Sequence, residues 1–253
     1  MTERIGFDRR LELDWLDLVA SRFAETGDAK AAFHDARVVV GATVGGGASH
    51  HNATGKTMTV LARVWLKVPP EVARLRDEAA AALVSLGPVD RSAIHWGMCE
   101  LAYPFYLDAA GVVGRAVRLQ DEVRLSVLRA RLAERWGARG TMPPASQRLL
   151  QMWARWGVLQ STVETGRYAS MPPRTIGTVS AGLLGQMRVL ADANAAVDVD
   201  DLQQAPDMFP FLLPDLRPLL SDSHVLQLNR EGGGRLVARS IRSDAPANVN
   251  HSK

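Results

Sequence analysis

Apolar residues recur at helical spacing along most of the chain. Near the N-terminus Leu11, Trp15 and Leu18 lie one helical turn apart, and Gly27 provides an end to that helix. The same periodicity predicts further helices over residues 28–39, 57–68, 71–86, 91–106 and 180–194. A strand is the alternative for 57–68, which is rich in β-branched residues, and the helix at 91–106 kinks or ends around Pro104. The pattern as a whole predicts a mainly α fold.

Two amphipathic helices are predicted in the middle of the chain. The first covers residues 121–136, ends at Gly137 and has an apolar face of Leu125, Leu128, Leu132 and Trp136. The second covers residues 145–156, ends at Gly157 and turns inward Leu149, Met152, Trp153 and Trp156. Only a short turn over residues 138–144 separates them, which makes this a helix-turn-helix arrangement.

Short apolar segments around glycine predict two β-hairpins. Residues 158–163 and 167–170 flank a turn that contains Gly166, directly after the second amphipathic helix. Residues 224–230 and 235–241 flank a glycine-rich turn near the C-terminus, with alternating residues on one buried face. Between the hairpins we expect an acidic loop at residues 198–201 and an irregular, proline-punctuated stretch at 206–218.

The order helix, turn, helix, hairpin over residues 111–171 resembles the winged helix-turn-helix superfamily. The stretch Trp-Ala-Arg-Trp-Gly-Val-Leu at 153–159 carries the resemblance, because the second helix of that fold often ends at a Gly followed by an apolar pair. We therefore expect three domains: a helical domain at 1–110, a winged helix-turn-helix at 111–175, and a C-terminal extension with a helix and a β-hairpin at 176–253. Members of the superfamily bind DNA or dock proteins.

Charge is distributed unevenly among these three segments. Residues 111–175 hold eleven Arg against four Asp and Glu, a net charge of +7, whereas residues 1–110 and 176–253 each carry −2. Arg pairs with phosphates and guanine edges through two N–H groups. A positive charge confined to one segment suggests a polyanion such as double-stranded DNA as the partner.

The polar face of the helix at 145–156 supplies candidate contacts to DNA. Gln and Arg are the side chains that read adenine and guanine edges in the major groove. Arginines in the preceding turn, at the tip of the wing and just beyond it are placed to contact phosphates. The predicted DNA-binding residues are Arg139, Gln147, Arg148, Gln151, Arg155, Arg167 and Arg174. The alternative is that these residues form an ordinary solvated helix face.

No catalytic, metal or cofactor site is predicted. The last three positions of a phosphate-binding P-loop motif are matched by Gly55, Lys56 and Thr57. However, His50 occupies the position where that motif needs its first glycine. We therefore expect a surface loop that leads into a helix. His95 and Cys99 have the spacing of metal ligands on a helix, yet their apolar neighbours favour a packed pair. An enzyme that uses His50, His51 and Lys56 is a third hypothesis for the chain.

Hydropathy and cysteine usage predict the compartment. The first twenty residues contain no apolar run typical of a signal peptide, and no uncharged run is apolar enough to span a membrane. The single cysteine, Cys99, cannot form an intramolecular disulfide. We expect a soluble, cytoplasmic protein without a membrane partner.

The layout of the chain also resembles BrxA, the family of small DNA-binding components of BREX phage-defence systems. The resemblance lies in the stretch Tyr-Pro-Phe-Tyr-Leu-Asp at 103–108 and extends to the Trp-Gly-Val-Leu at 156–159. It implies a helical protein that binds DNA without catalytic residues, alongside other defence-system proteins. The leading hypothesis is thus a non-enzymatic DNA-binding protein, and the alternative is an assembly subunit whose winged helix docks partner proteins.

Overall fold

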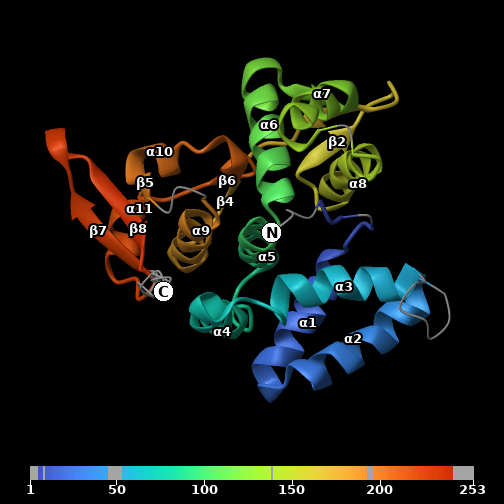
Figure 1. Ribbon diagram of the computed structural model, residues 1–253, viewed down its shortest axis with the longest axis horizontal. Coiled ribbons are helices and arrows are strands. Elements are labelled where there is room, and N and C mark those ends of the chain that lie inside the picture. Colours follow the sequence, from blue (N-terminus) through green and yellow to red (C-terminus); the bar gives the residue numbers. More distant parts are fainter. Residues whose placement is uncertain (1–4, 8, 45–52, 138, 193–195, 242–253) are drawn as a thin grey trace, which may run out of the picture.

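The computed structural model describes residues 5–7, 9–44, 53–137, 139–192 and 196–241 (Figure 1). Eleven α-helices, three short 3-10 helices and three small β-sheets lie within these residues. The predicted mainly α fold is confirmed. None of the described helices is long and apolar enough to cross a membrane.

The N-terminal helices follow the predicted periodicity. Helix α1 (Leu13–Thr26) ends at Gly27, whose φ of 64° suits glycine best. Helices α2 (Ala29–Val44) and α3 (Ala53–Trp65) come next, and a 3-10 turn η1 (Pro70–Val72) leads into α4 (Ala73–Ala82). The helix predicted over 57–68 is confirmed for residues 57–65 but not for 66–68, and its strand alternative is wrong.

Proline divides the next predicted helix into two. Helix α5 (Pro88–Ala102) ends before Tyr103, which adopts an extended conformation because the residue before a proline disfavours helical ψ. Pro104 then begins α6 (Pro104–Gln120), a helix that the sequence analysis does not predict beyond residue 106. Helix α6 runs across residues 110 and 111, where the first domain boundary is predicted.

The middle of the chain alternates short strands with helices. Strand β1 (Glu122–Arg124) leads into α7 (Leu125–Trp136), which is followed by α8 (Met142–Arg155), β2 (Leu159–Ser161) and β3 (Arg167–Ser170). These strands form an antiparallel sheet in the order β1-β3-β2. The helix predicted over 121–136 is wrong in its first four residues, because Asp121 has a φ of 54° and residues 122–124 pair with β3.

Helix α8 begins three residues before its predicted start. Pro143 and Pro144, assigned to the turn by the sequence analysis, occupy the first helical turn instead. A proline is well tolerated there, since the first backbone N–H groups of a helix have no partner within it.

The C-terminal segment contains short elements around one longer helix. After β4 (Arg174–Thr175) come α9 (Thr178–Ala191), β5 (Ala196–Asp198), α10 (Val199–Gln203), η2 (Pro206–Met208), β6 (Phe211–Leu212), α11 (Leu216–Ser221), β7 (Leu226–Arg230), η3 (Gly232–Gly234) and β8 (Leu236–Ser240). Strands β4 and β6 pair in parallel, and β5, β8 and β7 form an antiparallel sheet in that order. The predicted acidic loop at 198–201 is wrong, because the Asp198 carboxylate caps α10 by accepting hydrogen bonds from two of its backbone N–H groups.

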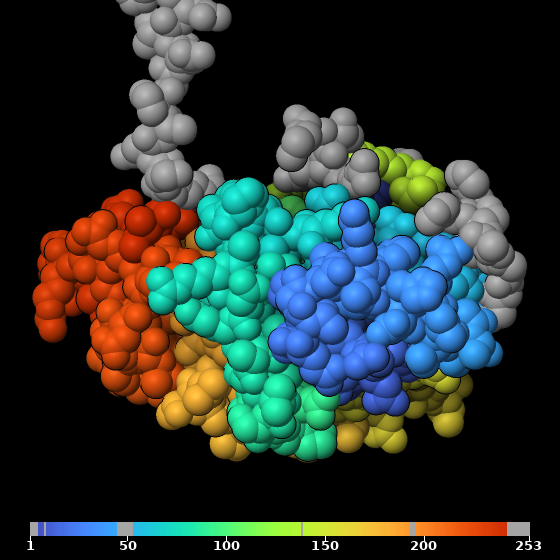
Figure 2. Space-filling model, turned by 90° about the horizontal axis from the view of Figure 1, so that it is seen from below, coloured from blue at the N-terminus to red at the C-terminus, as the bar shows by residue number. Residues whose placement is uncertain are grey.

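Aromatic side chains join the helices in the centre of the molecule. The Trp96 ring of α5 lies 5.1 Å from the Trp153 ring of α8 and 5.7 Å from that of Phe209, between centroids. Buried residues from all three predicted domains belong to the same apolar cluster. In Figure 2 the first helices (blue) and the C-terminal sheet (red) occupy different parts of one face, with α4 and α5 between them.

Candidate nucleic-acid interface

Helix α8 presents a polar face because its apolar residues are buried as predicted. Leu149, Met152 and Trp153 have no exposed surface, and Trp153 Nε1 donates a hydrogen bond of 2.9 Å to the Tyr106 hydroxyl. On the opposite side, Gln147 and Arg155 are exposed, and Arg148 and Gln151 are half-buried. All four predicted contacts on this helix therefore reach the surface.

An N-terminal segment, residues 9–12, lies against the same helix. The backbone N–H of Leu11 donates to the Met152 sulfur at 3.4 Å, and Trp156 Nε1 donates to the Leu11 carbonyl at 2.9 Å. Leu11 itself is completely buried. These contacts hold Arg9 and Arg10 beside α8, a placement that the sequence analysis misses although two adjacent arginines signal a charged surface.

The N-terminal segment and α8 enclose a cleft of about 760 Å³, which we call the basic cleft. Its charged lining residues are Arg9, Arg10, Arg148, Arg155 and Glu12. A second, more open cleft of about 670 Å³ shares Arg10, Gln151 and Arg155 with it and continues along β2. The surface of α8 thus forms part of an extended groove in which arginine outnumbers carboxylate.

Most of the positive charge in the basic cleft is not neutralised by the described residues. Arg155 Nη1 forms an ion pair of 2.6 Å with Glu12. Arg9, Arg10 and Arg148 form no ion pair with any described residue. The Arg9 Nε atom is buried and makes no hydrogen bond there either. The charges of Arg9, Arg10 and Arg148 can therefore act on an anion that enters the cleft.

The other three predicted arginines lie outside the basic cleft. Arg167 pairs with Glu122 at 2.5 Å and with Glu164 at 2.8 Å, and these hydrogen bonds raise its pKa. Arg174 is half-buried, donates to the Trp156 carbonyl at 3.4 Å and has a pKa that burial lowers. Arg139 is exposed, with its guanidinium 5.9 Å from the centroid of the Trp136 ring.

Gln147 lies at the end of α8 that faces α7. Its side-chain oxygen accepts a hydrogen bond of 3.4 Å from Arg129, which also donates to the Pro143 carbonyl at 3.1 Å. Arg129 therefore fixes the first turn of α8 against α7 and leaves the Gln147 amide group at the surface.

Three of the residues considered for metal or nucleotide binding, His95, Cys99 and Thr57, are buried within helices. His95 is completely buried and shares a hydrogen bond of 2.8 Å with Asp17, and burial lowers its pKa. Cys99 is buried as well, which raises the pKa of its thiol. The Thr57 hydroxyl donates to the Ala53 carbonyl within α3, while loop residues 45–52 lie outside the described residues. The described residues contain no group of three His, Cys, Asp or Glu that could hold a metal ion.

Comparison with known proteins identifies no relative of this chain. No protein-family model, curated protein or solved structure matches the chain. The functional argument consequently depends on the geometry and charge of the molecule.

Proposed function

We propose that this protein binds double-stranded DNA without catalysing a reaction. The observation that carries the proposal is the basic cleft, where Arg9, Arg10, Arg148 and Arg155 surround the carboxylate of Glu12, the one acid among the described residues that line it. Arginines that neutralise phosphates release counterions from DNA, and this release drives association. A groove with several arginines and one acid suits such a polyanion.

The order of elements supports a winged helix-turn-helix as the DNA-binding unit. Helix α6, β1, α7, α8, β2 and β3 follow one another, and β1 pairs with β3, which is the central strand of the β1-β3-β2 sheet. In this assignment α8 is the recognition helix, since the major groove admits one α-helix. Gln147 and Gln151 would then face base edges and Arg148 and Arg155 the adjoining phosphates, with the β2–β3 hairpin as the wing and the β7–β8 pair as a C-terminal extension.

The arginines outside the basic cleft have smaller roles in this proposal. Arg139 is exposed, so its guanidinium, 5.9 Å from the centroid of the Trp136 ring, can reach a phosphate. Arg167 would have to exchange two carboxylates for a phosphate, and Arg174 would have to leave its position over the Phe211 ring. We therefore expect Arg167 and Arg174 to contribute less than the four arginines of the cleft.

We further propose a role for the protein in the cytoplasm, as an accessory component of a prokaryotic phage-defence system. This part of the proposal rests on the resemblance to BrxA in the stretches at 103–108 and 156–159. Co-purification with the products of adjacent genes tests it separately from DNA binding.

Replacing Arg148 and Arg155 with Ala tests the DNA-binding proposal. We expect the affinity for a labelled random-sequence duplex to fall at least about tenfold at low salt, because two charge-assisted contacts are lost. The slope of log affinity against log salt concentration should become shallower by about 1.8, which corresponds to two phosphate contacts. Fluorescence anisotropy at several salt concentrations measures both quantities.

Two variants serve as controls for that experiment. Arg74→Ala removes an arginine of α4 that is 72% exposed and pairs with Glu78, so it should leave DNA affinity unchanged. Glu12→Gln releases Arg155 from its ion pair and should increase the affinity. Undiminished affinity in the Arg148→Ala, Arg155→Ala variant would refute the proposal.

A further inference from the structure

A second groove lies between α6 and α7 and has an apolar floor. Val112, Ala116 and Leu119 of α6 line it together with Val127 of α7, around a volume of about 450 Å³. Leu119 is 83% exposed and Val127 is 45% exposed. Exposed apolar residues that gather in one groove are typical of a binding surface, whereas scattered ones need no explanation. We call this surface the α6–α7 groove.

Two arginines stand above this floor, one on each helix. Arg115 of α6 is exposed and forms no ion pair with any described residue. Its side chain has several rotatable bonds, so its guanidinium can turn toward a carboxylate of a partner. Arg131 of α7 pairs at 3.1 Å with Glu134, and both side chains are 64% exposed. Exposed ion pairs of this kind contribute little to stability, so Arg131 can exchange Glu134 for a carboxylate of a partner at little cost. Glu134 also lines the groove, so its edge holds two arginines and one carboxylate and carries a net positive charge that suits an acidic partner.

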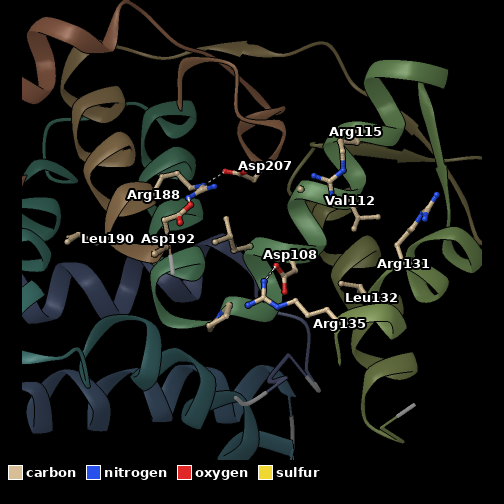
Figure 3. A pocket seen from close by; sticks show the side chains of 14 residues that line it. Asp108, Val112, Arg115, Arg131, Leu132, Arg135, Arg188, Leu190, Asp192 and Asp207 are labelled. Atoms are coloured by element: carbon tan, nitrogen blue, oxygen red, sulfur yellow. Dashed lines mark hydrogen bonds and ion pairs between the residues drawn. The ribbon is translucent and has the colours of Figure 1, made fainter. Parts of the chain in front are cut away.

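The α6–α7 groove continues into a larger cleft of about 570 Å³, shown in Figure 3, with which it shares Val112, Arg115 and Arg131. The other two arginines of this cleft are neutralised. Arg188 pairs with Asp207 at 2.7 Å and with Asp192 at 2.9 Å, and Arg135 pairs with Asp108 at 2.6 Å. Arg115 and Arg131 thus provide the positive charge that a partner would meet at the junction of the two spaces.

We propose that the α6–α7 groove docks an acidic amphipathic helix of another protein. The apolar face of that helix would cover Leu119 and Val127, and carboxylates on its flanks would pair with Arg115 and Arg131. Nucleic acid fits the groove less well, because a phosphate backbone offers no apolar surface to bury against the floor. A second copy of this chain also fits less well, since identical grooves would bring the same arginines against one another.

This docking surface is independent of the proposed DNA site. The α6–α7 groove shares no lining residue with the basic cleft or with its extension along β2. Occupation of one surface therefore leaves the residues of the other accessible. A protein with both surfaces could join a partner to DNA without using its recognition helix for the partner.

The test uses the full chain and a labelled synthetic helix as the probe. The probe carries Leu at positions i, i+3, i+4 and i+7 and Glu at its other positions, and a matched peptide carries Lys in place of Glu. We expect the acidic probe to bind at least about tenfold more tightly than the basic one. Leu119→Asp, and separately Arg115→Glu with Arg131→Glu, should each weaken the acidic probe at least about tenfold.

Matched variants separate this groove from other surfaces. Val84→Asp places the same charge at a residue that is 78% exposed and lies outside the groove, so it should leave probe binding intact. Arg148→Ala with Arg155→Ala should also leave it intact, which excludes attraction of the acidic probe to the basic cleft. Circular dichroism shows whether each variant is folded, and substitution of an exposed residue such as Leu119 should not disturb the core.

Three results would overturn the inference. Equal binding of the acidic and basic probes, or unchanged binding to Leu119→Asp, would exclude the α6–α7 groove as a site for acidic helices. Loss of duplex affinity in Arg115→Glu, Arg131→Glu, together with displacement of the probe by duplex, would assign the groove to nucleic acid. Self-association of the native chain that Leu119→Asp abolishes would assign it to a second copy.

Discussion

Glu100 is a carboxyl group in an almost completely buried position. It is 1% exposed, and one of its oxygens accepts a hydrogen bond of 2.8 Å from Trp96 Nε1. Its other oxygen has no partner among the described residues. Burial, and next the charge of Asp207, raise the pKa of Glu100 well above its ordinary value, although Arg188 acts in the opposite direction. Folding therefore favours the protonated form of this side chain.

The raised pKa predicts that the contribution of Glu100 to stability decreases as the pH rises. Above the ordinary carboxyl pKa the native state binds more protons at Glu100 than the unfolded state does, so the free energy of unfolding declines as the pH rises from that ordinary value toward the raised one. Glu100→Gln remains neutral and keeps an oxygen for Trp96, so part of this decline should disappear. Urea denaturation of both proteins across this range measures the difference. Glu71→Gln, at an exposed residue, should keep the native pH dependence, and equal slopes for Glu100→Gln and the native chain would refute the prediction.

Close contact between elements fixes individual residues on α6. A Cβ atom on Gly114 would lie 1.7 Å from the carbonyl oxygen of Pro206 in η2, so the helix can approach this backbone only with a glycine there. One turn earlier, a Cβ on Gly111 would meet nothing closer than the Arg115 guanidinium at 3.5 Å. The two glycines occupy the same helix but face different surroundings.

Alanine at these two positions should have opposite effects on stability. Gly114→Ala forces η2 away from α6 and should lower the free energy of unfolding by about 3 kcal/mol or more. Gly111→Ala gains helix propensity without a clash and should be neutral or stabilising by up to about 1 kcal/mol. Chemical denaturation of the two variants measures both effects, and equal stability would mean that α6 and η2 do not pack as described.

The sequence predicts those helices that bury only one face, because their apolar residues then recur at the helical period. The inward face of α8 is such a case, because Leu149, Met152 and Trp153 follow the helical period and are all buried. Strand β1 is missed because its three residues become a strand only by pairing with β3, more than forty positions later. Most of α6 is missed because glycine and alanine, which let it pack closely on several sides, weaken the amphipathic pattern.

The candidate site, like the fold, can be predicted from the sequence only in part. The polar face of α8 follows from its periodicity, and thus Arg148 and Arg155 could be named from the sequence alone. Arg9 and Arg10 could not, because their position depends on hydrogen bonds that join Leu11 to Met152 and Trp156, about 140 positions away. Likewise, spacing alone could not show that Arg167 would be paired with two carboxylates.

At the scale of the whole molecule, the basic cleft is formed by two segments that lie far apart in the sequence. Its arginines come from the segment before α1 and from α8, which are linked through buried Leu11. A DNA-binding unit limited to residues 111–175 would lack two of these four arginines. The proposed DNA site is consequently a product of the assembled molecule.

Removal of Arg9 and Arg10 tests whether the site is composite. Arg9→Ala with Arg10→Ala should make the salt slope of duplex binding shallower by about 1.8, as two lost phosphate contacts require. Fluorescence anisotropy at several salt concentrations measures this slope, and Arg74→Ala, measured in parallel, is the control variant. A slope equal to that of the native chain would restrict the contact surface to α8 and its wing.

The position of Leu11 also affects how the chain matures on the ribosome. Leu11 and Phe7 are completely buried, yet the groups that cover them include Trp156 and Tyr103, which are synthesised much later. At about 5–20 residues per second, on the order of ten seconds pass before Trp156 is made. For that time the nascent N-terminus exposes two apolar side chains to chaperones, and a product truncated before Trp156 would leave Leu11 only partly covered.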